Sequence, residues 1–274
     1  MSITATAQRA DFFGRGELVL AAGGMNYIGD LNNQSVFGTP HVAFGIGVRE
    51  RIDNRWAWRI EMNYGNISCD KDYIVRRNLS FRSHIYEGAA IMEFNFRPFG
   101  PGATESTWTP YIFGGFGIFH FSPEASYTDG EGNTQWVQLQ PLCTEGQGTP
   151  EYLDRHPYAL LQLCMPFGVG VKWRLGKTVS LSAEYGFRKT WTDYLDDVST
   201  TYVGSECLTA NVDNGELAAQ LADRTGEVVA DYENAPGIKR GDSSLDDWYA
   251  CFRITIGVSL ETMFGWMRSK RCKL

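Results

Sequence analysis

The chain has 274 residues, a formal net charge of −7 and an aromatic content of 14%. That length suits one large all-β domain or two ordinary domains, and the acidic balance argues against a nucleic-acid partner, which needs a basic surface. No run of about 18 apolar residues is present, so the sequence predicts no transmembrane helix. Transmembrane strands remain possible, because each needs only about 9–11 residues of alternating character.

The first fifteen residues carry a hint of export. Ala5-Thr6-Ala7 has the small-residue pattern of a signal-peptidase site, although the charged and apolar parts that should precede it are missing. We interpret residues 1–15 as the end of a signal peptide and a short N-terminal segment. The alternative is an ordinary disordered start.

Eight segments then alternate between apolar and polar residues with a period of two, which is typical of strands with one apolar face. The clearest is residues 55–65, where Trp56, Trp58, Ile60, Met62 and Tyr64 share one face. In chain order, the predicted strands cover residues 16–25, 41–50, 55–65, 82–98, 110–121, 165–175, 178–189 and 248–260.

The connections between these strands alternate in length. Those at residues 52–54, 99–107 and 176–177 are short or moderate, whereas those at 26–40, 66–81, 122–163 and 190–247 are long. An even strand count with short turns on one side and long loops on the other is the pattern of an outer-membrane barrel. We therefore predict an all-β fold: an eight-stranded antiparallel up-and-down transmembrane β-barrel over residues 16–260, with four long extracellular loops and periplasmic termini.

The main structural alternative is a soluble lipocalin-like barrel, which would place large apolar residues inside around a ligand. The polar face of the predicted strands favours the membrane barrel, because it holds many small residues and a few charges that can pair inside a narrow interior. The predicted interior charge network comprises Arg59, Glu61, Glu87, Glu93, Arg97, Lys172, Glu184, Arg188 and Arg253. The predicted aromatic girdle comprises Trp56, Trp58, Tyr64, Tyr86, Tyr111, Trp173, Tyr185 and Trp248.

Five segments of this chain resemble one protein family. They are residues 16–32 (GELVLAAGGMNYIGDLN), 77–87 (RNLSFRSHIYE), 139–149 (LQPLCTEGQGT), 186–202 (GFRKTWTDYLDDVSTTY) and 216–224 (ELAAQLADR). They are similar, in order and spacing, to the PorG-like outer-membrane β-barrel proteins of Bacteroidota. That family belongs to the type IX secretion system and associates with a periplasmic ring of PorK and PorN. The resemblance implies a non-enzymatic role with no cofactor and no small-molecule substrate.

The longest of these segments contains the family-motif loop, which we define as Arg188, Lys189, Asp193, Tyr194, Asp196, Asp197 and Tyr202. Its three aspartates could suggest acid–base catalysis or a calcium site. The spacing lacks the closing glutamate of an EF-hand, so we predict neither chemistry. We expect an ordered loop whose aspartates pair with Arg188 and Lys189.

Catalysis by a nucleophile has little support. Histidines His41, His84, His120 and His156 are scattered, and no base adjoins the hydroxyl run Ser199-Thr200-Thr201. A lipid-acting rim built from Asp70, Ser80 and His84 is a remote alternative. The six cysteines show no C-x-x-C pair, so no zinc site is predicted. Two of Cys69, Cys143 and Cys207 could form a disulfide, and Cys164 and Cys251 are expected to be buried thiols.

The last long loop, residues 191–247, carries thirteen acidic against three basic residues and contains a predicted short helix over residues 214–226. It is either a solvated surface or a docking surface. The tail, residues 261–274, is basic through Arg268, Lys270, Arg271 and Lys273. Its Cys272 could form a disulfide with a partner in an oxidising compartment.

We therefore expect a component of the type IX secretion system that anchors or organises the periplasmic ring at the outer membrane, in contact with its lipid. The alternatives are a general outer-membrane structural barrel or adhesin of OmpA/OmpX-like architecture and, less favoured, the soluble lipocalin-like barrel.

Overall fold

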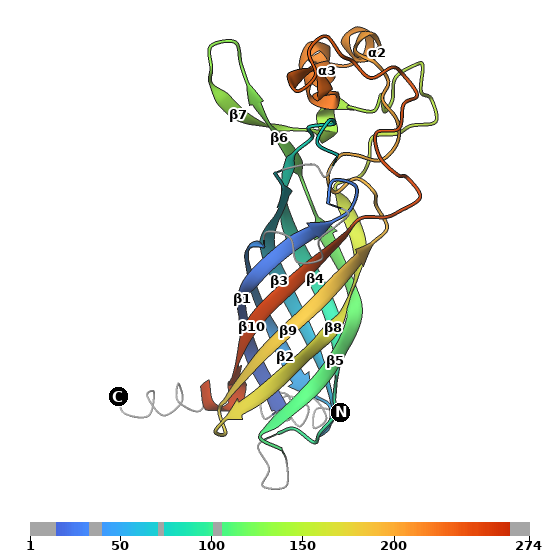
Figure 1. Cartoon of the computed structure of the whole chain (residues 1–274). Coiled ribbons are helices and arrows are strands. Elements are labelled where there is room, and N and C mark those ends of the chain that lie inside the picture. The colour runs from blue at the N-terminus through green and yellow to red at the C-terminus, as the bar shows by residue number, and fades with distance from the viewer. Residues whose placement is uncertain (1–14, 33–39, 71–73, 101–105, 264–274) are drawn as a thin grey trace, which may run out of the picture.

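The computed structural model describes residues 15–32, 40–70, 74–100 and 106–263. Within these ranges, eight long strands form a closed antiparallel barrel, and a folded cap stands on its long-loop end (Figure 1). The barrel strands are β1 (Gly16–Ile28), β2 (His41–Arg51), β3 (Trp56–Cys69), β4 (Phe81–Asn95), β5 (Trp108–His120), β8 (Leu161–Leu175), β9 (Val179–Thr190) and β10 (Trp248–Ser259).

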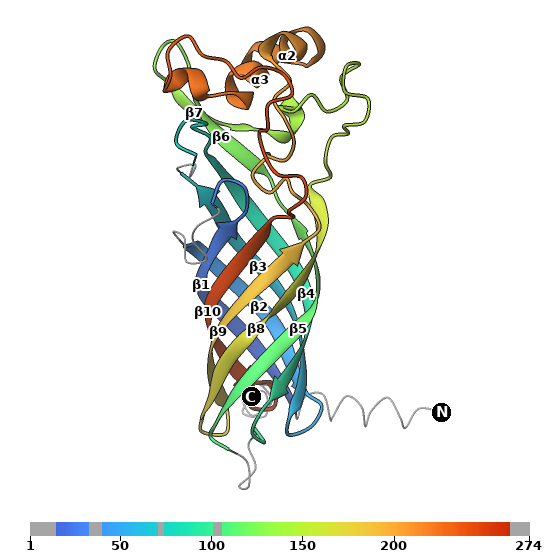
Figure 2. The same cartoon turned by 45° about the vertical axis from the view of Figure 1, so that its right-hand side comes forward.

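Each barrel strand pairs with its neighbours in the ring, in the order β3-β2-β1-β10-β9-β8-β5-β4, and β3 pairs with β4 to complete the circle. The first and last strands form a full seam that runs from Glu17 opposite Ser259 to Ile28 opposite Trp248. The strands tilt across the barrel axis, as closure of a small barrel requires (Figure 2). The predicted fold class and all eight predicted strands are confirmed.

The cap is made from the two longest connections. The loop between β5 and β8 contains a hairpin, β6 (Pro123–Thr128) and β7 (Thr134–Gln138), followed by the 3₁₀ turn η1 (Gln140–Leu142). The loop between β9 and β10 contains α2 (Ser205–Asn211), α3 (Gly215–Ala222) and the 3₁₀ turn η2 (Thr225–Glu227). The predicted helix is therefore confirmed as α3 with η2, whereas the hairpin and α2 were not predicted.

The cap has a hydrophobic core of its own, separate from the barrel. Ala125, Leu139 and Leu142 from one loop pack against Val203, Cys207, Leu208, Ala218, Leu221 and Ala222 from the other. Such a core is the mark of a folded unit, since a solvated loop buries little apolar surface. β6 also pairs with β4 through Ser83 and Pro123, so the hairpin extends one wall of the barrel upward.

Among the described residues, no helix is both long and apolar enough to cross a membrane.

Candidate functional site

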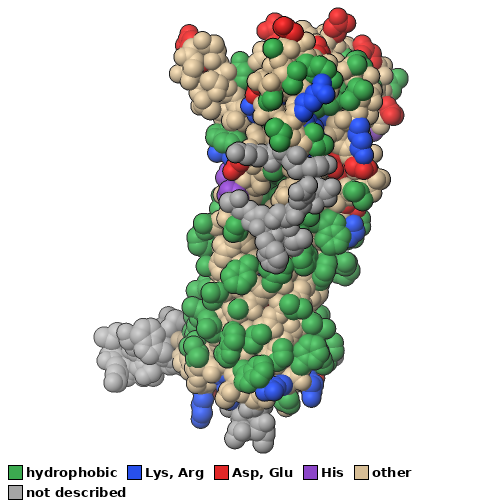
Figure 3. All heavy atoms as spheres, viewed as in Figure 1, with side chains coloured by type: hydrophobic (Ala, Val, Ile, Leu, Met, Phe, Trp, Pro, Cys, Tyr) green, Lys and Arg blue, Asp and Glu red, His purple; other side chains and the backbone are tan. Residues whose placement is uncertain are grey.

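The outer wall of the barrel is apolar. Side chains such as Phe44, Ile60, Met62 and Phe116 are more than half exposed although they lie in mid-strand. Figure 3 shows apolar side chains covering the visible face of the barrel, whereas acidic side chains gather on the cap. An apolar exterior around a polar interior is the arrangement of outer-membrane barrels and the reverse of a lipocalin. It excludes the lipocalin-like alternative.

Aromatic side chains mark both edges of this apolar wall. Trp108 lies opposite Trp173, and Trp56 opposite Phe94, near the short-turn end. Tyr64 lies opposite Tyr86 toward the long-loop end. Such girdles sit at the two membrane interfaces. Tyr111 does not belong to them, contrary to prediction: it is 1% exposed inside the barrel, where its hydroxyl donates to Glu184 (2.6 Å).

The barrel interior is filled by a continuous ion-pair network. Arg59 contacts Glu61 (2.9 Å), Glu93 (2.9 Å) and Glu184 (3.2 Å). Arg253 pairs with Glu184 and with Glu61 (3.0 Å). Arg59 on β3 and Glu184 on β9 are four strands apart in either direction around the ring. Their contact therefore spans the full width of the barrel.

The network extends toward both ends. Toward the long loops, Arg188 pairs with Glu87 (3.1 Å), which also accepts hydrogen bonds from Asn63 and Tyr249 (both 2.7 Å). Toward the short turns, Glu93 pairs with Lys172 (2.5 Å). A buried charge is tolerated only when it is paired and hydrogen-bonded.

The structure places eight of the nine predicted network residues inside the barrel, and Arg97 is the exception. β4 ends at Asn95, so the alternation no longer applies at Arg97. Its side chain is exposed, and its guanidinium lies over the Trp108 ring at 4.0 Å from the ring centroid. Arg49 was missed: it is 3% exposed and pairs with Glu93 (3.1 Å) and Glu17 (3.0 Å).

The long-loop mouth is closed by a hydrophobic plug. Strand residues Met25, Ile67, Ile85 and Phe119 pack with loop residues Leu31, Leu79, Phe121, Tyr158, Leu195 and Val198. Ionic side chains fill the middle of the barrel and apolar ones this end, so no open channel runs through the described structure. Residues 186–202, the segment that contains the family-motif loop, supply two of the plug residues, Leu195 and Val198.

The aspartates of the family-motif loop lie beneath the cap, and their partners differ from those expected. Arg188 pairs with Glu87 and Lys189 with Asp246 (3.0 Å), so neither base contacts the predicted aspartates. Asp197 accepts hydrogen bonds from Thr144 (2.5 Å) and Tyr158 (2.7 Å) and lies 3.6 Å from Arg240. The prediction of Arg188 and Lys189 as partners is therefore wrong.

Asp196 shares a tyrosine with a second carboxyl group. The Tyr27 hydroxyl lies 2.5 Å from Asp196 Oδ2 and 3.0 Å from Asp247 Oδ1. One hydroxyl proton cannot be donated to both carboxyl groups at once. The arrangement therefore favours the protonated, neutral form of at least one of the two carboxyl groups.

Burial governs the ionisation of these acids. It raises the pKa of Asp193 to about 9, of Asp196 to about 7 and of Asp197 to about 6, and it also raises that of Asp247, where the neighbouring carboxylates act in the same direction. Asp193 is 7% exposed, and neither of its carboxyl oxygens lies within hydrogen-bond geometry of a partner among the described residues, although the nearby Ser199 lowers its pKa in part. Its neutral form is therefore the stable one at neutral pH.

The five segments that carry the family resemblance meet at the base of the cap. Glu145 accepts hydrogen bonds from the backbone amides of Ser199 and Thr200 (both 2.9 Å) and pairs with Arg240 (3.0 Å). Arg240 donates to the Ala222 carbonyl (3.1 Å), and Arg77 donates to the Arg240 carbonyl. Tyr27 completes the set through Asp196. These segments therefore hold the cap on the barrel.

The remaining members of the motif also have structural surroundings. Tyr202 is 4% exposed, and its backbone amide donates to Ile238 (2.9 Å). Tyr194 stacks on Tyr158, with ring centroids 4.6 Å apart. These contacts pack both tyrosines against other parts of the protein.

In the described part of the chain, the residues considered for catalysis or metal binding do not come together in one site. His84 bonds to Tyr64 (3.1 Å), Ser80 to Arg224 (3.2 Å) and Asp70 to Ser68 (3.5 Å), so the lipid-acting rim is not formed. Within residues 15–263, apart from the gaps given above, no group of three His, Cys, Asp or Glu side chains could hold a metal ion.

Within the described part of the chain, no disulfide joins Cys69, Cys143 and Cys207. Their loops separate them: Cys207 belongs to the cap core, and Cys69 bonds to the Leu31 carbonyl at the barrel rim (3.5 Å). Cys164 and Cys251 are buried in the barrel. Cys272 and the basic tail from residue 264 lie outside the described residues, as do residues 1–14.

The sequence matches one family model of unknown function, and the structure is similar to several outer-membrane barrels. A family model described as "Domain of unknown function (DUF6089)" matches residues 4–138, just under half of the chain. No curated protein matches the sequence.

Among solved structures, the chain is similar to Neisserial surface protein A, with 11% identity and a TM-score of 0.43 over 89% of this chain and 96% of that one. It is also similar to the outer membrane protein OprG from Pseudomonas aeruginosa, with 10% identity and a TM-score of 0.41 over 89% and 96% of the two chains. The attachment invasion locus protein Ail of Yersinia pestis gives 8% identity and a TM-score of 0.40 over 89% and 97%.

Proposed function

We propose that this protein is a non-enzymatic outer-membrane component of the type IX protein secretion system, which anchors or organises the periplasmic ring of that machine. The observation that carries the anchoring role is the filled barrel. Its interior is occupied by paired charges, and its long-loop mouth is closed by the plug described above. An eight-stranded barrel of this kind serves as an anchor and not as a passage for protein cargo.

The assignment to type IX secretion is supported by the resemblance of the five segments to PorG-like proteins. Those segments come together at the base of the cap, where they make the contacts that fold it. Their similarity to the family is therefore a similarity of cap architecture. Contact with a periplasmic ring must come from the opposite, short-turn end of the barrel, which we place in the periplasm with both termini.

The test is a gene deletion complemented with a tagged full-length copy. We expect the deletion to abolish delivery of cargo bearing the C-terminal signal domain to the cell surface. We expect the tagged protein, solubilised from outer membranes in detergent, to recover the PorK-type lipoprotein. Normal cargo delivery in the deletion strain, together with a tagged barrel free of ring components, would reject the secretion role.

The second candidate is a general outer-membrane structural barrel or adhesin. It is favoured by the cap, whose separate hydrophobic core makes a rigid platform beyond the membrane. If cargo delivery is normal, binding of cells to surfaces should be compared between the wild type and a strain lacking only residues 121–160. A loss of binding would support this candidate.

A further inference from the structure

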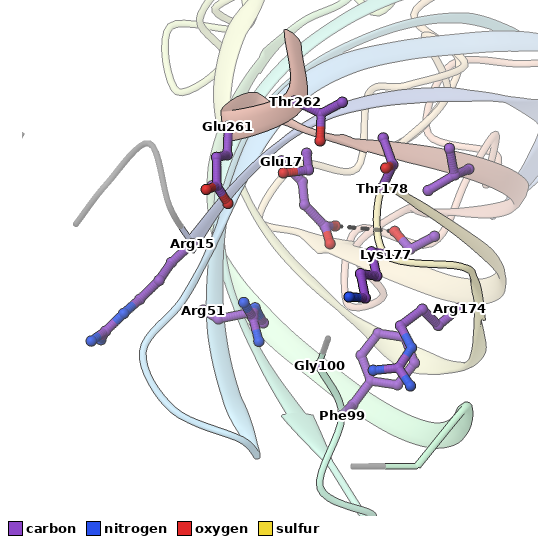
Figure 4. A pocket seen from close by; sticks show the side chains of 14 residues that line it. Arg15, Glu17, Arg51, Phe99, Gly100, Arg174, Lys177, Thr178, Glu261 and Thr262 are labelled. Atoms are coloured by element: carbon purple, nitrogen blue, oxygen red, sulfur yellow. Dashed lines mark hydrogen bonds between the residues drawn. The ribbon is translucent and has the colours of Figure 1, made fainter. Parts of the chain in front are cut away.

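The short-turn mouth of the barrel contains a cavity of about 670 Å³ (Figure 4). It lies among the ends of β1, β2, β8, β9 and β10 and reaches inward to Glu17 and Ser180. Basic residues dominate its charged lining, which comprises Arg15, Arg51, Arg174 and Lys177 against Glu17 and Glu261. In Figure 4, Arg51, Arg174 and Lys177 surround one opening, whereas Arg15 extends away from it.

The positive charge of this cavity is not cancelled by the barrel. The described interior network balances itself, with five bases (Arg49, Arg59, Lys172, Arg188, Arg253) and five acids (Glu17, Glu61, Glu87, Glu93, Glu184). Glu17, the acid nearest the cavity, is already engaged by Arg49 (3.0 Å) and Ser180 (3.1 Å). Within the described structure, neither Glu17 nor Glu261 forms an ion pair with Arg51, Arg174 or Lys177.

One of these bases has a buried nitrogen without a partner. Arg174 Nη1 is inaccessible to solvent, and no hydrogen bond reaches it within the described structure. An unsatisfied buried donor is costly, and a guanidinium is best satisfied by a carboxylate that accepts two parallel hydrogen bonds. Phe99, which is 5% exposed, adds an apolar surface to the cavity lining.

We propose that this cavity is the docking site for an acidic peptide segment of a periplasmic protein, whose carboxylates pair with Arg51, Arg174 and Lys177. The proposal rests on the orientation given under the proposed function. Charge complementarity identifies the occupant, because the cavity lining carries four basic residues against two acidic ones. The cavity opens within the ring of strand ends, so a peptide reaches it along the barrel axis, whereas lipid headgroups lie outside the wall.

The test uses the purified full-length chain in phosphatidylcholine nanodiscs and fluorescein-labelled hexaglutamate as the probe, with binding followed by anisotropy. Two variants of equal charge change are compared. Arg51→Gln with Lys177→Gln alters the cavity. Arg55→Gln with Arg97→Gln alters two exposed bases of the same rim that do not line it. We expect the cavity variant to bind about tenfold or more weakly and the rim variant to bind nearly as tightly as wild type.

A third variant, Arg174→Gln, should weaken hexaglutamate binding without altering the heat-modified mobility of the folded barrel in gels. Equal weakening by the cavity and rim variants would overturn the proposal, because binding would then depend only on overall charge. So would absence of binding to wild type, or full displacement of the peptide by millimolar inorganic phosphate, which would indicate a small-anion site. The assay contains no ring protein. Hexaglutamate binding, combined with normal cargo delivery in the deletion strain and a failed pull-down, would therefore reject the secretion role and leave the cavity assignment standing.

Discussion

Glu184 shows how single residues make this interior possible. Its carboxylate meets Arg59 from one side and Arg253 from another, and Tyr111 donates a further hydrogen bond. Burial of an ion pair is costly, and removal of one partner leaves the other charge uncompensated, at a cost of about 3–5 kcal/mol. The network is therefore intolerant of single substitutions, although each pair contributes little net stability.

Asp193 gives a prediction about pH. Its pKa is raised to about 9 in the folded cap, while an unfolded aspartate ionises near pH 4. Between these values the folded form binds more protons than the unfolded form, so the stability of the cap falls as pH rises. Asp193→Asn cannot ionise, and we expect the cap of this variant to lose less stability between pH 6 and pH 8.5.

Limited proteolysis of the cap loops at the two pH values measures this effect, because cleavage follows the population of the open form. Asp196 and Asp197 contribute to the same dependence of cap stability on pH. Asp193→Asn should therefore reduce this dependence without abolishing it. Asp213→Asn, an exposed aspartate of the same loop, is the control and should match wild type. Identical slopes for wild type and Asp193→Asn would contradict the pKa assignment.

At the scale of elements, close approach of strands depends on glycine at particular positions. Gly168 on β8 lies opposite Gly186 on β9, and a Cβ at Gly186 would lie 2.6 Å from the ring of Phe113. We expect Gly186→Ala to cost about 1–3 kcal/mol through overpacking. The loss should be less than additive in the double variant with Phe113→Ala, because the colliding ring is then absent.

Urea unfolding of the protein in lipid vesicles measures these free energies. Gly88→Ala is the matched control, because a Cβ there would have its nearest contact at 4.0 Å. It should be close to wild type. Strict additivity between Gly186→Ala and Phe113→Ala would show that the ring is not what excludes a side chain at this position.

The alternation of residues predicted the barrel strands and most of its interior, because a strand offers only two faces. The alternation gave wrong assignments for two residues. Arg97 follows the end of β4, where the alternation of faces stops, and both faces of β5 are apolar near Tyr111. The pattern therefore could not assign either side chain to the interior or the exterior. Arg49 was within reach, since Val42, Phe44, Ile46 and Val48 place it on the opposite, interior face of β2.

The cap could not be predicted in the same way. Its short elements are held by contacts between distant loops, such as Glu145 with Ser199 and Arg240 with Asp197. No local periodicity encodes these pairs. The neighbours Arg188 and Lys189 were expected to pair with the aspartates because they are near in sequence, yet strand geometry points Arg188 into the barrel.

For the whole molecule, the apolar wall predicts where charge is tolerated. Ile254 lies in the middle of β10 and is 50% exposed, so it should face lipid. We expect Ile254→Lys to destabilise the barrel by about 2–4 kcal/mol, the cost of a basic side chain near the bilayer centre. Urea unfolding in vesicles provides the measurement.

Leu153→Lys supplies the comparison, since Leu153 belongs to the cap and is 78% exposed. It should be neutral. If Ile254→Lys were equally harmless, the exposed apolar face of the barrel would not be in contact with lipid, and the assignment to a membrane would have to be withdrawn.

The contact between Arg59 and Glu184 across the barrel has a consequence for biogenesis. Half of the ring separates their strands, and the sheet closes only when β1 meets β10. In an incompletely inserted chain, charged side chains of the interior therefore lack their ion-pair partners inside the membrane, where water is scarce. Insertion intermediates should be short-lived and readily degraded, so that the cell accumulates either finished barrels or none.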